Sequence, residues 1–166
     1  MLGADTVVVI DGTVLNKPAD AAEAMAMLGR LSGRTHTVYT GLCVIRAANG
    51  ADPAPASARY GEQTIWLELV AAEVAFHPLE PAQIAAYVAT GEPLDKAGAY
   101  GLQGLGGAMV RAVHGSYTAV VGLPLPEVHR LLSAAGVGGL GDPAVTYQRW
   151  LQSQGKEPLP CPPTRP

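Results

Sequence analysis

Residues 7–15 read Val-Val-Val-Ile-Asp-Gly-Thr-Val-Leu, and this stretch decides how the fold begins. The run of β-branched residues at its start is typical of a buried strand. The dipeptide Asp11-Gly12 is a strong signal for a two-residue hairpin turn, so residues 13–15 are expected to return beside that strand. The chain is therefore predicted to begin with a strand over residues 2–10 and a short hairpin partner.

The chain beyond this hairpin alternates helical and strand-like patterns. Asp20 and Glu23 have the spacing of a helix N-terminal capping box, and Gly33 is placed to end that helix. Further strands are expected at residues 35–45, 64–76 and 109–113, and further helices at residues 80–91 and 126–136. Residues 49–58 have the composition of a loop, whereas residues 117–121 fit a strand or a short helix. This alternation predicts an α/β fold with a mixed sheet.

The composition changes after residue 137. Residues 138–166 are rich in Gly, Gln and Pro, and the proline-rich end from Cys161 onward cannot form regular structure. We expect one domain over residues 1–137 and a flexible Gly/Pro-rich tail over residues 138–166. Within that tail, the sequence allows one helical turn near residues 147–151.

The composition bounds the class of protein. A length of 166 residues with 48% hydrophobic residues allows one domain with a sizeable core. The sequence has neither an apolar run of about 18 residues nor a basic segment followed by an apolar one at its start, so neither a membrane span nor a secretory signal is expected. The net charge of −3 disfavours non-specific nucleic-acid binding. Two cysteines without C-x-x-C spacing indicate a buried free thiol at Cys43 and a reducing, cytoplasmic location.

Residues 94–107, Leu-Asp-Lys-Ala-Gly-Ala-Tyr-Gly-Leu-Gln-Gly-Leu-Gly-Gly, carry the strongest chemical signal. The segment combines the carboxylate of Asp95, the ammonium of Lys96, the amide of Gln103 and five glycines. Glycine permits positive φ and a close approach of the backbone to a ligand, and lysine and backbone N–H groups suit a phosphate chain. The amide suits recognition of a base edge through its paired donor and acceptor. Alternatively, Asp95 and Lys96 form a surface ion pair and Gln103 is solvated.

Two further short motifs carry charged groups. Asp5 and Thr6 stand directly before the apolar strand run, where a carboxylate suits a general base or a metal ligand, although it could equally cap a turn. Lys17 precedes Pro18, which restricts the backbone of Lys17. The chain has eight arginines but only three lysines, and Lys17 and Lys96 both lie in these motifs. This usage favours a role for a compact ammonium, the alternative being two ordinary surface lysines.

Other familiar site patterns are absent from the sequence. The glycines of residues 101–107 lack the G-x-G-x-x-G spacing of a dinucleotide loop, and no P-loop occurs. The four histidines are scattered, without the spacing of a zinc site. The G-x-S-x-G elbow of serine hydrolases is also missing.

The order of the motifs is more specific than any one of them. The series is Gly3-Ala4-Asp5-Thr6, Lys17-Pro18, Leu-Ser-Gly-Arg-Thr-His at residues 31–36, Tyr39-Thr40-Gly41, the segment from Leu94 to Gly104, Gly115-Ser116-Tyr117, and Val121-Gly122-Leu123-Pro124. From Leu2 to Leu132 this series resembles the Maf family of nucleoside triphosphate pyrophosphatases. The Asp-Lys-Ala-Gly-Ala-Tyr-Gly-x-Gln-Gly form is similar to the family branch that hydrolyses dTTP and UTP. The branch acting on 7-methyl-GTP carries a different sequence there.

The resemblance implies a fold, an activity and a set of roles. The fold is a mixed-sheet, ITPase-like α/β fold with a cleft between two lobes, usually a homodimer. The activity is hydrolysis of dTTP and UTP to the nucleoside monophosphate and pyrophosphate, which cleans the nucleotide pool and is linked to arrest of septum formation. The implied roles are a water-activating catalytic base for Asp5, selection of the pyrimidine base by Thr6 and Gln103, neutralisation of the triphosphate by Lys17 and Lys96, and, for Asp95, either binding of a divalent cation (Mg²⁺ or Mn²⁺) or orientation of Lys96.

The chain departs from the family pattern at its start. Family members begin with a strand, a Ser-x-Ser-Pro-Arg-Arg loop and a helix, and none of these precedes Gly3. The serine and arginines of that loop would grip phosphate through charge-assisted bonds. Either the natural reading frame begins upstream of Met1, which we expect, or the chain is a truncated relative with altered activity. The alternative functions are therefore a non-catalytic nucleotide-binding regulator of septum formation and a pyrophosphatase of other base preference.

Overall fold

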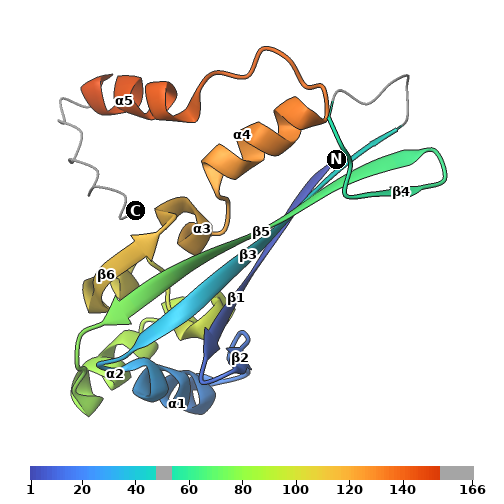
Figure 1. The fold of residues 1–166 in the computed structure, drawn as a ribbon. Coiled ribbons are helices and arrows are strands. Elements are labelled where there is room, and N and C mark those ends of the chain that lie inside the picture. Colours follow the sequence, from blue (N-terminus) through green and yellow to red (C-terminus); the bar gives the residue numbers. More distant parts are fainter. Residues whose placement is uncertain (48–53, 154–166) are drawn as a thin grey trace.

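The computed structural model describes residues 1–47 and 54–153, in which strands and helices alternate along the chain (Figure 1). The strands are β1 (Leu2–Ile10), β2 (Thr13–Leu15), β3 (Thr35–Ala47), β4 (Ala58–Tyr60), β5 (Gln63–Phe76) and β6 (Val110–Gly115). The helices are α1 (Ala21–Leu31), α2 (Pro81–Val88), α3 (Tyr117–Val121), α4 (Leu125–Ala134) and α5 (Pro143–Ser153). Three short 3-10 turns, η1 (Glu92–Asp95), η2 (Ala97–Ala99) and η3 (Leu105–Met109), lie between α2 and β6.

The described strands form one sheet in the order β2-β1-β3-β5-β4, with β6 also paired to β5. The combination of this sheet with helices agrees with the α/β class expected from the sequence. Every described pair is antiparallel, however, so the expected mixture with parallel pairs is wrong for these strands. The cause is the hairpin between β1 and β2, which reverses the chain before α1. Strand β3 therefore returns antiparallel to β1, on the side of β1 opposite β2.

Local contacts explain why the first elements begin and end where the sequence predicts. Asp11, with φ of 52°, and Gly12, with φ of 70°, take the left-handed conformation that a two-residue hairpin needs. At the start of α1, the Asp20 carboxylate accepts a hydrogen bond from the N–H of Glu23 at 2.8 Å. The Glu23 carboxylate accepts from the N–H of Ala19 at 2.7 Å. The second bond of the predicted capping box therefore closes one residue earlier than in the usual pattern.

For two segments near the C-terminus, the structure settles an open alternative in one case and corrects the expected length in the other. Residues 117–121 form the helix α3, because the Ser116 hydroxyl caps it by accepting from the N–H of Ala119 at 3.2 Å. Residues 143–153 form α5, which is longer than the single turn expected there. Proline disrupts a helix mainly when it lies in the helix interior. Pro143 is the first residue of α5, where proline is tolerated, so the helix can form.

Some sequence predictions fall partly or wholly outside the described residues. Residues 49–53 of the expected loop and residues 154–166 of the expected tail, including Cys161, are in this group. Within the described part, Cys43 is a half-buried free cysteine on β3. The division into a domain over residues 1–137 and a flexible tail remains a prediction.

Helices α1, α2 and α4 pack on one face of the sheet and bury two groups of side chains (Figure 1). The first core cluster contains Val8, Ile10, Val38, Val74 and Phe76 of the sheet, Leu28 and Leu31 of α1, and Ile84 and Tyr87 of α2. The second contains Leu42, Val44 and Trp66 of the sheet with Val128 and Leu131 of α4. Because the clusters lie at different positions along the long strands, they form two lobes on the same face.

A buried aromatic group belongs to the first cluster. The rings of His36, Phe76 and Tyr100 meet edge to face, with centroids 4.8 to 5.5 Å apart. The Nε2 atom of His36 and the hydroxyl of Tyr100 are hydrogen-bonded at 2.8 Å. Burial lowers the pKa of His36 to about 4 and raises the pKa of Tyr100, so both side chains are neutral near pH 7.

Replacing His36 by Gln is expected to remove a pH dependence of stability. The pKa of His36 falls from the ordinary value of 6.5 to about 4 on folding, so the unfolded chain takes up the proton first. The free energy of unfolding of the wild type should fall as the pH drops from 6.5 towards 4, by an amount on the order of 3 kcal/mol. Urea unfolding of both proteins across this range measures the difference, and parallel curves would contradict the assignment.

Replacing Gly98 by Ala is expected to loosen the join between the 94–107 segment and the first hairpin. The N–H of Gly98 donates to the carbonyl of Asn16 at 3.1 Å, its φ is +68°, and an added Cβ would lie 2.9 Å from Cγ1 of Val8. Left-handed strain and overpacking together should lower the free energy of unfolding by about 2–4 kcal/mol. The control is Gly29→Ala in α1, where an added Cβ meets nothing within 4 Å. This substitution should raise the free energy of unfolding by up to about 1 kcal/mol, because alanine favours the helix more than glycine does. Thermal unfolding measures the stability of both variants. Equal changes in their melting temperatures would contradict a special role for Gly98.

Candidate functional site

A cleft of about 570 Å³ opens beside β1, between the η1–η2 segment and α3. Its walls also include part of β3 and the glycine loop, which we define as residues 101–107. All six residues singled out by the sequence line this cleft: Asp5, Thr6, Lys17, Asp95, Lys96 and Gln103. The fold therefore brings three separate motifs to one place. The roles of these residues remain predictions.

The first motif lies along β1. The Asp5 side chain is exposed, and one of its carboxylate oxygens accepts from the N–H of Thr6 at 2.9 Å. The hydroxyls of Thr6 and Thr40 are 2.8 Å apart, and the buried Thr40 hydroxyl donates to the Ala119 carbonyl at 2.7 Å. Since Thr40 has a single hydroxyl hydrogen, Thr6 must be the donor between the two threonines. Thr6 is thereby held in one orientation, and its oxygen keeps only lone pairs for any further partner.

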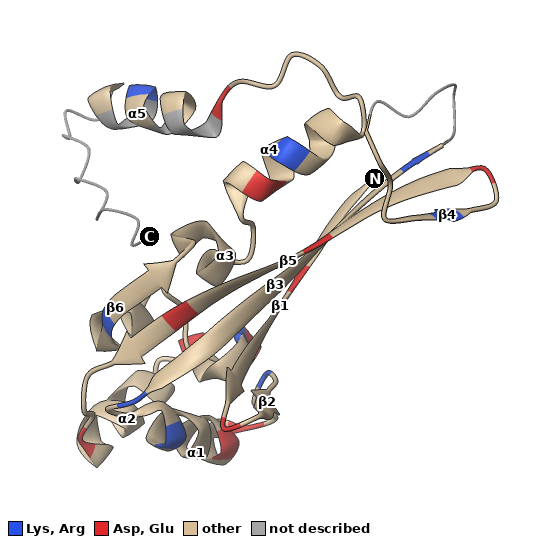
Figure 2. Cartoon of the chain, viewed as in Figure 1, with Lys and Arg blue, Asp and Glu red and all other residues tan. Residues whose placement is uncertain are grey.

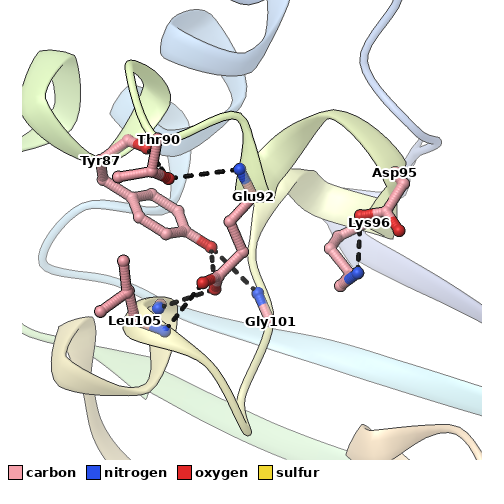
Figure 3. Close-up of polar contacts among 8 residues, drawn as sticks. Tyr87, Thr90, Glu92, Asp95, Lys96, Gly101 and Leu105 are labelled. Carbon is pink, nitrogen blue, oxygen red and sulfur yellow. Dashed lines mark hydrogen bonds and ion pairs between the residues drawn. The ribbon is translucent and has the colours of Figure 1, made fainter.

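The second and third motifs bring two ammonium groups to the cleft. Lys17 follows Asn16, whose carbonyl accepts the Gly98 hydrogen bond, and this contact ties the end of the hairpin to the segment that carries Lys96. The Lys96 ammonium donates to Asp95 at 2.6 Å, and the two side chains are 41% and 73% exposed (Figure 3). The hydrogen bond and charge of Lys96, with a further contribution from Lys17, lower the pKa of Asp95. At this exposure the ion pair itself adds little stability.

Glu92, which the sequence analysis did not single out, also lines the cleft. Its carboxylate accepts from the Tyr87 hydroxyl at 2.9 Å, from the N–H of Leu105 at 3.0 Å and from the N–H of Gly106 at 3.1 Å (Figure 3). Partial desolvation acts to raise the pKa of Glu92, but these hydrogen bonds and the charge of Lys96 outweigh it, so the pKa is lowered. The only sequence signal for Glu92 was its position beside the Asp95-Lys96 pair.

The glycine loop is built for close packing more than for positive φ. Among its glycines none has positive φ, in contrast to Gly98 just before it. A Cβ at Gly106 would lie 2.6 Å from the Tyr87 hydroxyl oxygen, and one at Gly107 would lie 2.5 Å from the Leu102 carbonyl oxygen. A Cβ at Gly104 would overlap the Glu92 carboxylate. The glycines therefore let the loop fold tightly on itself and on Glu92, leaving the side chain of Gln103 exposed.

The charges around the cleft are close to balanced. The cleft lining includes the carboxylates of Asp5, Glu92 and Asp95 and the ammonium groups of Lys17 and Lys96. Figure 2 shows acidic and basic positions interspersed along the ribbon in this view. In residues 1–47 and 54–153, no three His, Cys, Asp or Glu side chains gather closely enough to hold a metal ion by themselves. A polyanion entering the cleft therefore meets too little positive charge from these side chains to neutralise it.

The described helices include none that is both long and apolar enough to cross a lipid bilayer.

Comparison with known proteins identifies relatives with a stated activity. Three of them are named dTTP/UTP pyrophosphatase. That of Moorella thermoacetica is 51% identical over 137 residues, covering 82% of this chain and 64% of its own length. Those of Escherichia coli O157:H7 and Salmonella typhimurium are 50% and 53% identical over 133 residues, each covering 80% of this chain and 60% of its own length. The chain thus spans about 60% of the length of these relatives.

A family model described as Maf-like protein matches residues 1–135. The match covers most of the described chain and includes all six candidate site residues. It agrees with the resemblance noted over Leu2 to Leu132 and, together with the described sheet and helices, confirms the expected α/β, Maf-like fold class. The chain therefore belongs to the Maf-like protein family.

Proposed function

We propose that this chain carries the nucleotide cleft of a pyrophosphatase that hydrolyses dTTP and UTP to the nucleoside monophosphate and pyrophosphate. The observation that carries the proposal is the convergence of three separate motifs on one cleft of about 570 Å³. Relatives at about 50% identity that are named dTTP/UTP pyrophosphatase support the choice of substrate. The volume falls in the usual range for small-molecule sites.

In this proposal Asp5 is the general base that activates water. Its carboxylate is exposed at the cleft, and the N–H of Thr6 occupies only part of its accepting capacity. The water would attack the α-phosphorus in line with the departing pyrophosphate. Lys17 and Lys96 would bind the phosphate oxygens and neutralise the charge that develops on the leaving group.

A divalent cation, Mg²⁺ or Mn²⁺, fits the charge of the cleft. Three carboxylates and two ammonium groups leave a deficit of positive charge for a triphosphate. Asp95 and Asp5 are oxygen donors of the type these cations prefer, and phosphate oxygens commonly complete their coordination. When bound, the cation would supply charge neutralisation and polarise the α-phosphate. Alternatively, Asp95 only orients Lys96, as its 2.6 Å ion pair allows.

Base selection in this proposal falls to Gln103 and Thr6. The Gln103 amide is exposed in the cleft lining and offers one acceptor and two donors to a base edge. The Thr6 hydroxyl oxygen, whose hydrogen is committed to Thr40, offers acceptors only. The imide N–H shared by uracil and thymine is a matching donor.

Three expectations stay attached to the proposal, one from the cysteine usage and two from the family resemblance. We place the protein in the cytoplasm, as a homodimer, with a link to the arrest of septum formation. No nucleic-acid partner is proposed. The competing function is nucleotide binding without turnover, and the experiment below separates the two.

Pyrophosphate release from dTTP, UTP, CTP, GTP and 7-methyl-GTP with Mg²⁺ or Mn²⁺ tests the proposal. We expect release from dTTP and UTP, and Asp5→Asn should lower kcat by about 10²- to 10⁴-fold because the amide cannot accept the proton. Binding of UMP should be retained. The control is Asp11→Asn, whose exposed carboxylate pairs with Arg34 at 2.6 Å and is not part of the cleft lining.

Each other outcome of this experiment has a stated meaning. A folded chain that binds UMP without releasing pyrophosphate from any triphosphate would favour the binding-only function. Release that Asp5→Asn leaves unchanged would exclude Asp5 as the base. Release mainly from 7-methyl-GTP or GTP would favour a pyrophosphatase of other base preference.

Replacing Gln103 by Ala is expected to weaken discrimination between bases. Loss of a directional hydrogen bond to the base should lower kcat/KM for UTP by about tenfold and leave that for CTP less affected. Gln148→Ala, an exposed position on α5 outside the cleft lining, is the control. Steady-state kinetics on both triphosphates measures the ratio, and an unchanged ratio would refute the role of Gln103.

A further inference from the structure

Two side chains that lie close together in the sequence, Tyr87 and Glu92, hold the glycine loop through hydrogen bonds. Tyr87 comes from α2 and Glu92 from η1. The Tyr87 hydroxyl accepts from the N–H of Gly101 at 3.2 Å and donates to the Glu92 carboxylate at 2.9 Å (Figure 3). Glu92 in turn accepts from the N–H groups of Leu105 and Gly106. We call this pair the Glu92–Tyr87 anchor.

The anchor fixes the loop on both sides of Gln103. Gly101, two residues before Gln103, is bound through Tyr87, and Leu105, two residues after it, is bound through Glu92. The loop also packs directly against Glu92, because a Cβ at Gly104 would overlap the Glu92 carboxylate. The backbone that carries Gln103 is therefore pinned at two points only a few residues apart.

The hydrogen bonds argue against a direct chemical role for Glu92. Its Oε1 atom accepts from the Tyr87 hydroxyl and the N–H of Gly106, and its Oε2 atom accepts from the N–H of Leu105. An oxygen with two such partners has its accepting capacity filled. On Oε2 one accepting site is left, so three of the four accepting sites of Glu92 are used to hold Tyr87 and the loop.

We propose that Glu92, acting with Tyr87, is a positioning residue that holds the Gln103 loop in the geometry needed to discriminate bases in the cleft. This inference rests on the proposed function for its kinetic consequence, but its structural part does not. In the wild type the anchor orders the loop before the nucleotide arrives, so the binding energy of Gln103 is not spent on ordering it.

The test compares Glu92→Gln and Tyr87→Phe with the wild type and a control. Glu92→Gln replaces one accepting oxygen by an NH₂ group that faces backbone N–H donors, and Tyr87→Phe removes a single hydroxyl and leaves the carboxylate charge intact. The control is Glu73→Gln, an exposed carboxylate on β5 outside the cleft lining. If Glu92→Gln fails to fold, Tyr87→Phe carries the test alone.

The first readout is amide hydrogen exchange, which needs no enzymatic activity. Exchange at Gly101 should speed up by about tenfold or more in Tyr87→Phe, and exchange at Leu105 and Gly106 by a similar factor in Glu92→Gln. Exchange in α1 should not change. Unchanged exchange in the loop of both variants would overturn the anchor, whatever the activity of the chain.

The second readout is the ratio of kcat/KM for UTP to that for CTP, with its split into kcat and KM. We expect the ratio to fall at least threefold in both variants, mainly through a higher KM for UTP, and to stay constant in Glu73→Gln. Faster exchange with an unchanged ratio would overturn the positioning role. A raised Mn²⁺ requirement in Glu92→Gln but not in Tyr87→Phe would overturn it in favour of a metal ligand.

A wild-type chain that releases no pyrophosphate would refute the proposed function and not the anchor. In that case binding of UMP against CMP replaces the kinetic ratio. A selectivity for UMP that both variants lose supports the positioning role, and a selectivity that both retain overturns it.

Discussion

The close contact of Gly98 with the first hairpin is the constraint on which the site depends. It joins the backbone of the 94–107 segment to Asn16 and presses it against Val8 in the core. This join helps to set where Lys96 lies relative to Lys17 and to Asp5 on β1. Glycine can adopt positive φ without the steric cost of a Cβ. Gly98 therefore allows the 94–107 segment to lie against the first hairpin, where the three motifs meet at one cleft.

Much of the fold could be predicted from local patterns. The Asp11-Gly12 turn, the capping box at Asp20 and the long apolar runs of β3 and β5 each carry their structure within a few residues of sequence. Strand pairing was harder, because a helix between two strands suggests a parallel pair unless a hairpin first reverses the chain. The helix α5 was underestimated because glycines and prolines dominate its surroundings.

The candidate site likewise contains residues that the sequence predicted and one, Glu92, that it did not. The six predicted site residues, all of which line the cleft, were found through the order of motifs. That order comes from resemblance to a family and not from periodicity. Glu92 was missed because its partners are set by tertiary folding: the N–H groups of Leu105 and Gly106 lie 13 and 14 residues away in sequence. The glycines of the loop were noticed for the wrong physical reason, since they make room for Glu92 and Tyr87 and do not supply positive φ.

The aromatic group beneath the cleft has an electrostatic consequence. Tyr100 forms part of the cleft wall, and His36 stands directly behind it at 2.8 Å. Burial keeps His36 uncharged until the pH falls to about 4, and it keeps the phenol of Tyr100 protonated well into the alkaline range. His36 and Tyr100 therefore add no charge to this side of the cleft across the pH range of a living cell. Any proton exchanged when a nucleotide binds near neutral pH must come from the charged rim or from the terminal phosphate of the nucleotide itself.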